Sequence, residues 1–205
     1  MKPVYWLKEL SKDSIAAAGG KAANLAELYN AGLPVPEAFV VSSQAYFDFL
    51  EKNGLQELIE KELSKLDVQD SQKLQEASGR IKKIIVEARI PNETRVEIVR
   101  AYNKLCGVEL IPSLAQEAFV AVRSSATAED LPGYSFAGQM VTFLNVRGSE
   151  EVVKAVRGCW ASLFEARAIY YRAVNKFDHL EVGIAVIIEK MVEANKSGVM
   201  FTANP

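Results

Sequence analysis

The segment Val120–Val146 reads VAVRSSATAEDLPGYSFAGQMVTFLNV, and the rest of the chain is interpreted around it. An apolar run that ends at Arg123 predicts one strand, and the alternation in Val141–Val146 predicts a second. The connection between them is long and rich in small and polar residues, whereas ordinary hairpin loops have roughly 2–5 residues. This pattern is typical either of a loop that lies over a ligand or of a plain exposed hairpin loop.

The chemistry of this connection suits a phosphate group. Its unhindered backbone N–H groups and its hydroxyls can form an anion-binding concavity. Arg123, at the root of the loop, adds a planar fork of N–H donors that matches phosphate oxygens. Composition alone does not choose between a phosphate lid and an exposed hairpin, so both readings stay open at this point.

The overall composition argues against several classes of protein. The 205 residues are 49% hydrophobic and 24% charged, with a net charge of −2, as is usual for a globular domain. A near-neutral chain gives no electrostatic case for binding nucleic acid. No apolar run approaches the roughly 18 residues of a membrane span, and the N-terminus does not resemble a signal peptide. We therefore expect neither nucleic acid nor a membrane as a partner.

The residues that often carry metal or nucleophilic chemistry are few and scattered. Cys106 and Cys159 lie far apart in helical patterns, which favours neither a disulfide framework nor a metal site and suits a reducing cytoplasm. His179 is the single histidine, and no catalytic set can be built around it. We expect it to be structural.

A Gly-Gly-Lys sequence at 19–21 opens a predicted helix over Ala22–Asn30. Helix N-termini attract anions through free N–H groups and the helix dipole, so a lysine there indicates a bound anion or an ordinary solvated helix entry. The sequence is too short for a P-loop. The residues expected on the apolar face of this helix are Leu25, Leu28 and Tyr29.

The next elements follow from turn and cap signals. Gly32 and the two prolines after it end the first helix, and Phe39–Val41 is a predicted strand. Ser42 or Ser43 is expected to begin a helix that stops at Gly54. Residues 55–107 read as a block of amphipathic packing helices without identifiable chemistry.

The part of the chain after the central loop predicts two helical segments and a strand pair. Ser149 is expected to cap a helix, and Phe164–Val174 continues helically. Val182–Met191 is almost continuously apolar, which predicts a strand buried on both faces. Ser197–Thr202 is predicted to be its antiparallel partner.

Several motifs, in this order along the chain, carry a resemblance to a known family. The chain is similar to the nucleotide-binding part of phosphoenolpyruvate synthases (pyruvate, water dikinases), within the broader pyruvate phosphate dikinase N-terminal family. The stretches that carry the resemblance are GGKAANL at 19–25 with GLPVP at 32–36, AVRSSATAEDL at 121–131 with SFAGQ at 135–139, CWASLFEARAIYYR at 159–172, and SGVMFTANP at 197–205.

The resemblance implies an α+β, ATP-grasp-type lobe with a mainly antiparallel sheet, helices and a helical insertion at about 43–117. It implies that ATP is bound, with Lys21 and Arg123 as catalytic contacts to the phosphates. The loop after Arg123 would close over the phosphates, and the end of the buried strand would be the hinge beside adenine. The further residues implied in ATP binding are Ser124, Ser125, Thr127, Ser135, Gly138, Gln139, Glu189, Lys190, Met191 and Val192.

Two positions depart from the family pattern. Glu189 stands where relatives commonly have Gln, and an ionised carboxylate cannot donate a hydrogen bond to a base. Gly133-Tyr134 stands where many relatives have Asp-Ala. The first departure bears on how adenine is recognised, and the second makes the loop locally unusual.

The resemblance also implies that this chain carries only part of an enzyme. Residues 1–182 would form the first lobe, and residues 183–205 the start of a second. The Mg²⁺ ligands, the phosphorylated histidine and the pyruvate-binding domain would lie outside these residues. We therefore expect the chain to bind ATP weakly, to be inactive alone and to associate with those domains. An uncovered sheet edge can pair with a second copy of the chain, so a homodimer would be compatible with this arrangement.

Other functions remain open at this stage. A rifampicin phosphotransferase-like enzyme has a similar loop, and the acceptor substrate is chosen by domains outside this chain. Pyruvate phosphate dikinase itself fits less well, because its loop is Met-rich where this one reads SFAGQ at 135–139. A non-catalytic nucleotide-binding module is the alternative from another class.

Overall fold

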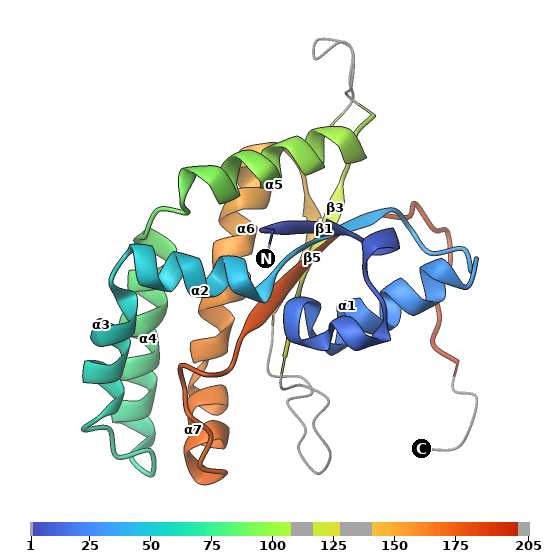
Figure 1. Ribbon diagram of the computed structural model, residues 1–205. Helices are drawn as coiled ribbons and strands as arrows, with labels where there is room; N and C mark the ends of the chain where they lie inside the picture. Colours follow the sequence, from blue (N-terminus) through green and yellow to red (C-terminus); the bar gives the residue numbers. More distant parts are fainter. Residues whose placement is uncertain (1, 108–116, 128–140, 201–205) are drawn as a thin grey trace.

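The computed structural model describes residues 2–107, 117–127 and 141–200. They form a five-stranded sheet in the order β1-β2-β5-β3-β4, in which every neighbouring pair is antiparallel (Figure 1). The predicted α+β class with an antiparallel sheet is confirmed. The strands are β1 Val4–Trp6, β2 Ala38–Val41, β3 Val120–Ala126, β4 Thr142–Val146 and β5 Ile184–Lys190.

The central strand β5 is buried on both faces along its apolar part, as the sequence predicts. It pairs with β2 on one side and with β3 on the other, so both of its edges are occupied. The predicted pairing with Ser197–Thr202 is therefore wrong for the part that is described. Residues 197–200 form no strand, and Val199 is 85% exposed.

The position of β5 also bears on the division into lobes. The family resemblance implies a boundary near residue 182, before this strand. In the structure, β5 is the middle strand of the sheet that contains β1 to β4. Residues 184–190 therefore belong to the same unit as the strands that precede them.

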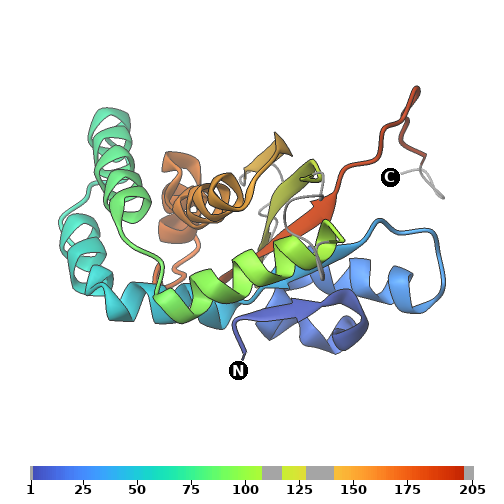
Figure 2. The same ribbon diagram turned by 90° about the horizontal axis from the view of Figure 1, so that it is seen from above.

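One face of the sheet is covered by helices with large side chains. Helices α2, α5 and α6 lie on this face, and α3 and α4 form an outer pair farther from the sheet (Figures 1 and 2). The core there contains fully buried Trp160, Phe49 and Phe164. The helix bounds are α2 Ser43–Lys52, α3 Leu55–Leu63, α4 Ser71–Glu87, α5 Asn92–Leu105, α6 Ser149–Ala161 and α7 Ala166–Val174.

The other face is covered in part by α1, Ile15–Asn30, which is broken at Gly19. Its buried side consists of small residues such as Ala22 and Ala26. The predicted apolar face is wrong, because Leu28 and Tyr29 are exposed and Leu25 is only partly buried. Alanines let the helix backbone lie close to the strands, and this close packing decides which side faces the sheet.

Several predicted helix ends agree with the structure, and two helix starts do not. Ser42 caps α2 by accepting a hydrogen bond from the Ala45 N–H, and Gly32, with φ 77°, follows the end of α1. The cap of α6 is Gly148, not Ser149, and its φ of 91° suits glycine. The predicted helix Phe164–Val174 is interrupted at Glu165, which has extended ψ.

Candidate functional site

The break in α1 brings a helix N-terminus against the end of β3. Gly19 has φ 75°, and a Cβ atom built there would lie 2.3 Å from the Ser125 backbone oxygen. Past the break, the Ala22 N–H donates to Ser125 Oγ over 3.2 Å. Lys21 Nζ donates to the Ser124 carbonyl over 3.4 Å. Glycine at position 19 thus permits the close approach that places Lys21 beside β3.

Arg123 lies next to this contact and on the face of the sheet that α1 covers. It is paired in register with Ile187 of β5, which packs against the α1 alanines, and with Thr142 of β4. Directly opposite residues of an antiparallel pair share one face. Lys21 and Arg123 are far apart in sequence, but Lys21 contacts the backbone of the residue that follows Arg123.

A carboxylate accompanies the arginine. Arg123 Nη1 lies 2.8 Å from Glu189 Oε2, and the two side chains are 38% and 13% exposed, respectively. Glu189 is in register with Ala121 of β3 and so projects to the same face. The guanidinium is thus accessible to solvent, while its carboxylate partner is largely sheltered.

The predicted hydroxyl contacts are engaged with the protein backbone. Ser124 Oγ donates to the Val141 carbonyl over 3.0 Å, which joins β3 to the chain before β4. Thr127 Oγ1 accepts from the Gly183 N–H over 3.1 Å, and the Thr127 N–H donates to the Gly183 carbonyl. These bonds hold the two ends of the central loop. The predicted contacts Ser135, Gly138 and Gln139 lie outside the described residues.

The predicted hinge, residues 189–192, begins with the last two residues of β5. The Lys190 N–H donates to the Glu37 carbonyl and the Met191 N–H to the Phe119 carbonyl, both over 2.9 Å, after which the chain leaves the sheet. A groove of about 900 Å³ lies here. Its lining includes Phe119, Arg147, Lys190, Met191 and Val192.

The groove and the Lys21 contact lie toward opposite ends of one strand. From Phe119, which precedes β3, to Ser125 the chain advances six residues, or roughly 20 Å at about 3.3 Å per residue. Arg123 and its partner Glu189 lie between these ends. Sequence reasoning missed Phe119 and Arg147, whose guanidinium is 5.3 Å from the Phe119 ring centroid. Phe119 lies within the apolar run that predicts the first strand and Arg147 follows the second predicted strand, so no local pattern marked either as a ligand contact.

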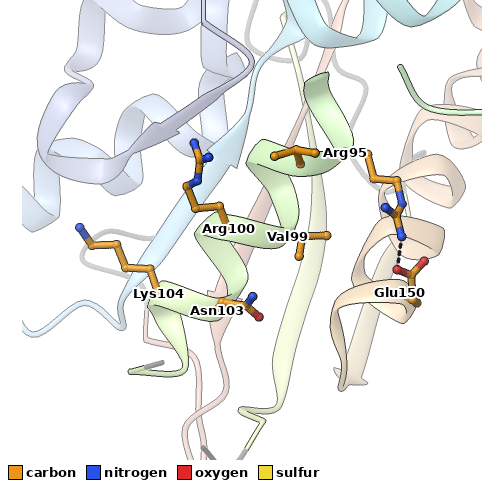
Figure 3. Close-up of a pocket in the computed structure, with 7 residues that line it drawn as sticks. Arg95, Val99, Arg100, Asn103, Lys104 and Glu150 are labelled. Carbon is orange, nitrogen blue, oxygen red and sulfur yellow. Dashed lines mark hydrogen bonds and ion pairs between the residues drawn. The ribbon is translucent and has the colours of Figure 1, made fainter. Parts of the chain in front are cut away.

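A second groove, of about 620 Å³, follows the outer side of α5 (Figure 3). Its cations already have partners: Arg95 pairs with Glu150 of α6, and Arg100 pairs with Glu97 of its own helix. Exposed pairs of this kind are typical of a solvated helix face. We assign no ligand to this groove.

His179 is a packing residue. Its Nδ1 accepts a hydrogen bond of 3.1 Å from Nε of Arg172, which is fully buried. Burial, and then the adjacent Arg172 charge, lower the pKa of His179 to about 4. A neutral imidazole that accepts from a buried guanidinium supports the expected structural role.

Neither a metal site nor a membrane segment is evident in the described ranges. Residues 2–107, 117–127 and 141–200 contain no group of three or more His, Cys, Asp or Glu side chains that could hold a metal ion. Over the same ranges, no helix combines the length and apolar character that crossing a membrane requires.

Comparisons with known proteins point to one family. The family described as "Pyruvate phosphate dikinase, AMP/ATP-binding domain" matches residues 15–205. The chain is 53% identical over its whole length to a "Probable phosphoenolpyruvate synthase" of Methanocaldococcus jannaschii, of which it covers 17%. It is 51% identical to a protein of the same description from Methanothermobacter thermautotrophicus, covering all of this chain and 29% of that one.

A third relative is the "Phosphoenolpyruvate synthase" of Pyrococcus furiosus, 43% identical over 98% of this chain and 28% of the relative. The chain thus spans less than a third of the length of each of these three relatives. The family match covers most of the chain, and its fold type, ATP-grasp, is consistent with the open antiparallel sheet. The chain belongs to the pyruvate phosphate dikinase AMP/ATP-binding domain family.

Proposed function

We propose that this chain is the ATP-binding portion of a phosphoenolpyruvate synthase, with the phosphates held between Lys21 and Arg123. The observation that carries the proposal is the contact of Lys21 Nζ with the carbonyl of Ser124, the residue after Arg123. Lys21 and a helix N-terminus thus meet β3 at the residues that follow Arg123. Family membership and the names of the relatives support ATP as the ligand.

The pair of cations suits phosphoryl transfer. Arg offers a planar fork and Lys a point charge, and both match phosphate oxygens. Phosphoryl transfer depends mainly on positioning and on neutralising charge. Fixed cations beneath a loop can supply both. In this proposal the loop from Ser124 to Gln139 covers the phosphates, with Ser125, Thr127, Ser135 and Gly138 among its contacts.

The base would lie at the other end of β3, in the groove beside the hinge. Lys190, Met191 and Val192 line this groove, and the thioether of Met191 can pack on a flat ring. The separation of roughly 20 Å along β3 leaves room for an extended nucleotide between the groove and Lys21. Arg123, in the middle, would meet the phosphate chain.

The remaining steps belong to parts of a longer protein. The chain covers 17–29% of its relatives, which supports further domains as partners. Phosphorylation of a histidine on another domain, the Mg²⁺ ligands and pyruvate binding are proposed to lie there. We also propose that the second lobe begins after Lys190, where the chain leaves the sheet, and that the protein works in the cytoplasm.

Calorimetric titration with ATP tests the phosphate site. Arg123→Ala and Lys21→Ala should each weaken ATP binding about 10- to 100-fold, because a hydrogen bond to a charged group contributes about 1.5–3 kcal/mol. Arg95→Ala is the matched control, since Arg95 also pairs with a glutamate but lies on α5. Equal affinities in all four proteins would contradict the assignment.

A coupled assay with ATP, Mg²⁺ and pyruvate tests the proposal that the complete reaction needs further domains. The 205-residue chain should show no turnover and weak ATP binding, because a site between two lobes loses contacts when one lobe is absent. Turnover by the isolated chain would refute the proposal that it is inactive alone. Transfer of phosphate to rifampicin by the complete protein would favour the alternative enzyme.

A further inference from the structure

The ion pair between Arg123 and Glu189 has two possible relations to a phosphate ligand. Glu189 could occupy the arginine in place of the ligand and release it on binding. It could instead stay bonded and hold the guanidinium in the orientation that the ligand needs. The two relations predict opposite effects of removing the carboxylate.

The burial of the two side chains decides between them. Glu189 is 13% exposed and Arg123 is 38% exposed, so the carboxylate is the more sheltered partner. Moving the arginine away would leave a sheltered carboxylate without its cation, which is strongly unfavourable. A guanidinium has five N–H donors, and one contact through Nη1 leaves others for an incoming oxygen. The arrangement therefore favours a bond that persists when the ligand binds.

We propose that Glu189 is a positioning residue, which holds Arg123 for the phosphate chain of ATP through a bond that survives nucleotide binding. This inference rests on the proposed function, because it takes Arg123 as a phosphate contact. Glu189 itself touches no phosphate. Its carboxylate also balances part of the positive charge that Lys21 and Arg123 bring together.

The backbone around Glu189 is suited to this role. Within the sheet, Glu189 is in register with Ala38 of β2 and with Ala121 of β3, so strands flank it on both sides. The next two residues, Lys190 and Met191, donate their N–H groups to neighbouring backbone carbonyls. A functional side chain is positioned most precisely when the residue that holds it lies on a rigid helix or strand. Glu189 thereby links the hinge at the groove to the arginine at the phosphates.

The test compares ATP with tripolyphosphate, a phosphate chain without a base. Glu189→Ala should weaken binding of both about tenfold, as Arg123→Ala does, whereas adenosine binding should stay unchanged. The double variant Arg123→Ala/Glu189→Ala should lose little more than either single variant, since both act through one contact. Glu189→Gln keeps an acceptor oxygen and should recover about half of the loss on a logarithmic scale.

A direct readout follows the Arg123 side chain by ¹⁵N NMR. Its Nε–H signal should be ordered in the unaltered chain with and without ATP, and mobile in Glu189→Ala. Glu165→Ala is the matched control, because Glu165 is a partly buried glutamate paired with Lys82 at 2.9 Å, outside the site. This control should leave both the Arg123 signal and ATP binding unchanged.

The possible failures are distinguishable. Tighter ATP binding by Glu189→Ala or Glu189→Gln would show that the carboxylate competes with phosphate and would overturn the inference. Additive losses in the double variant, or an equal loss for adenosine, would do the same. An Arg123 signal in the unaltered chain that does not respond to saturating ATP would contradict the proposed function itself, and the inference with it.

Discussion

The two faces of the sheet are built from different residues. Helices α2, α5 and α6 cover one face (Figure 2), and aromatic and branched side chains fill the space beneath them, with the Trp160 and Phe49 ring centroids 4.7 Å apart. The face under α1 is filled largely by alanines, and Gly19 makes the closest approach. Beyond α1, the described residues on this second face include Arg123 and Glu189.

The difference indicates a division between stability and ligand binding. Each aromatic residue can bury about 150–250 Å², and apolar area contributes roughly 25 cal/mol per Å². Alanine contributes little area, but it lets backbones approach closely, and here that approach brings Lys21 to β3. We therefore expect the helical face to determine unfolding free energy and the α1 face to determine the shape of the candidate site.

The largest expected effect comes from the helical face. Trp160→Ala should lower the free energy of unfolding by about 4 kcal/mol, since it deletes a fully buried indole and leaves a cavity. Chemical denaturation measures this loss. Under conditions where the variant is folded, its ATP affinity should equal that of the unaltered protein.

Trp160→Phe is the matched control for this change. The indole Nε1 is buried and has no hydrogen-bond partner in the described part of the chain, so its removal leaves no acceptor unpaired. The free energy of unfolding should fall by much less than for alanine. A large loss of ATP affinity in the folded alanine variant would break the proposed division between the faces.

Gly19→Ala tests the α1 face. The added Cβ would meet the Ser125 backbone oxygen, and position 19 has a positive φ. Crowding and backbone strain together predict a loss of about 3 kcal/mol in unfolding free energy. ATP binding should fall as well, because the shift moves Lys21 away from β3. Calorimetry and denaturation together check both effects.

Gly79→Ala is the control for this substitution. Gly79 lies inside α4, and a Cβ there would meet no atom within 4 Å. Alanine in a helix interior is favoured over glycine by about 1 kcal/mol, so this variant should be slightly more stable. If Gly19→Ala were equally harmless, the close approach of α1 would not be what shapes the site.

Much of the fold could be predicted from local patterns, and two features could not. The strands at 38–41, 120–126, 142–146 and 184–190 follow from apolar runs and alternation. The sheet order does not, because β5 lies between two strands that precede it in sequence. The buried face of α1 was missed since hydrophobicity favours Leu28 over Ala26, whereas close packing favours alanine.

The sequence predicted which types of residue the candidate site would contain, but not which of these residues would contact one another. Arg123 and Lys21 were singled out because cations suit phosphate and because the family resemblance implies that role, and in the structure Lys21 contacts the residue after Arg123. The bond from Arg123 to Glu189 depends on the register of β3 against β5, which no local pattern contains. The departure at Glu189 was visible in the sequence, but its partner was not.

The pH dependence of the free energy of unfolding tests a partly buried group among the helices, His179. His179 is the only histidine, and its pKa of about 4 is below the usual 6.5 because of burial and Arg172. The unfolded chain therefore binds a proton more readily, so stability is full above pH 6.5 and falls as the pH drops towards 4. The loss should reach roughly 2 kcal/mol, since the side chain is partly exposed.

His179→Asn provides the comparison for this titration. The variant keeps an acceptor for Arg172 but has no titrating group, so its stability should change less between pH 6.5 and 5. Denaturation at several pH values measures both slopes. Identical slopes in the two proteins would place the titrating group elsewhere.

The smallest expected effect concerns a tyrosine that joins the helical layer to the strands. Tyr102 of α5 donates its hydroxyl to the Ala118 carbonyl and accepts from the Gly148 N–H, over 2.8 and 2.9 Å. Tyr102→Phe should cost about 1 kcal/mol of unfolding free energy, because it leaves both backbone groups without this partner. Tyr170→Phe, at a more exposed site on α7, should cost almost nothing. ATP affinity should be unchanged in both, since neither tyrosine lines the groove at Phe119; a loss confined to Tyr102→Phe, whose hydroxyl bonds the groove-lining Ala118, would mean that the helical layer also sets the shape of that groove.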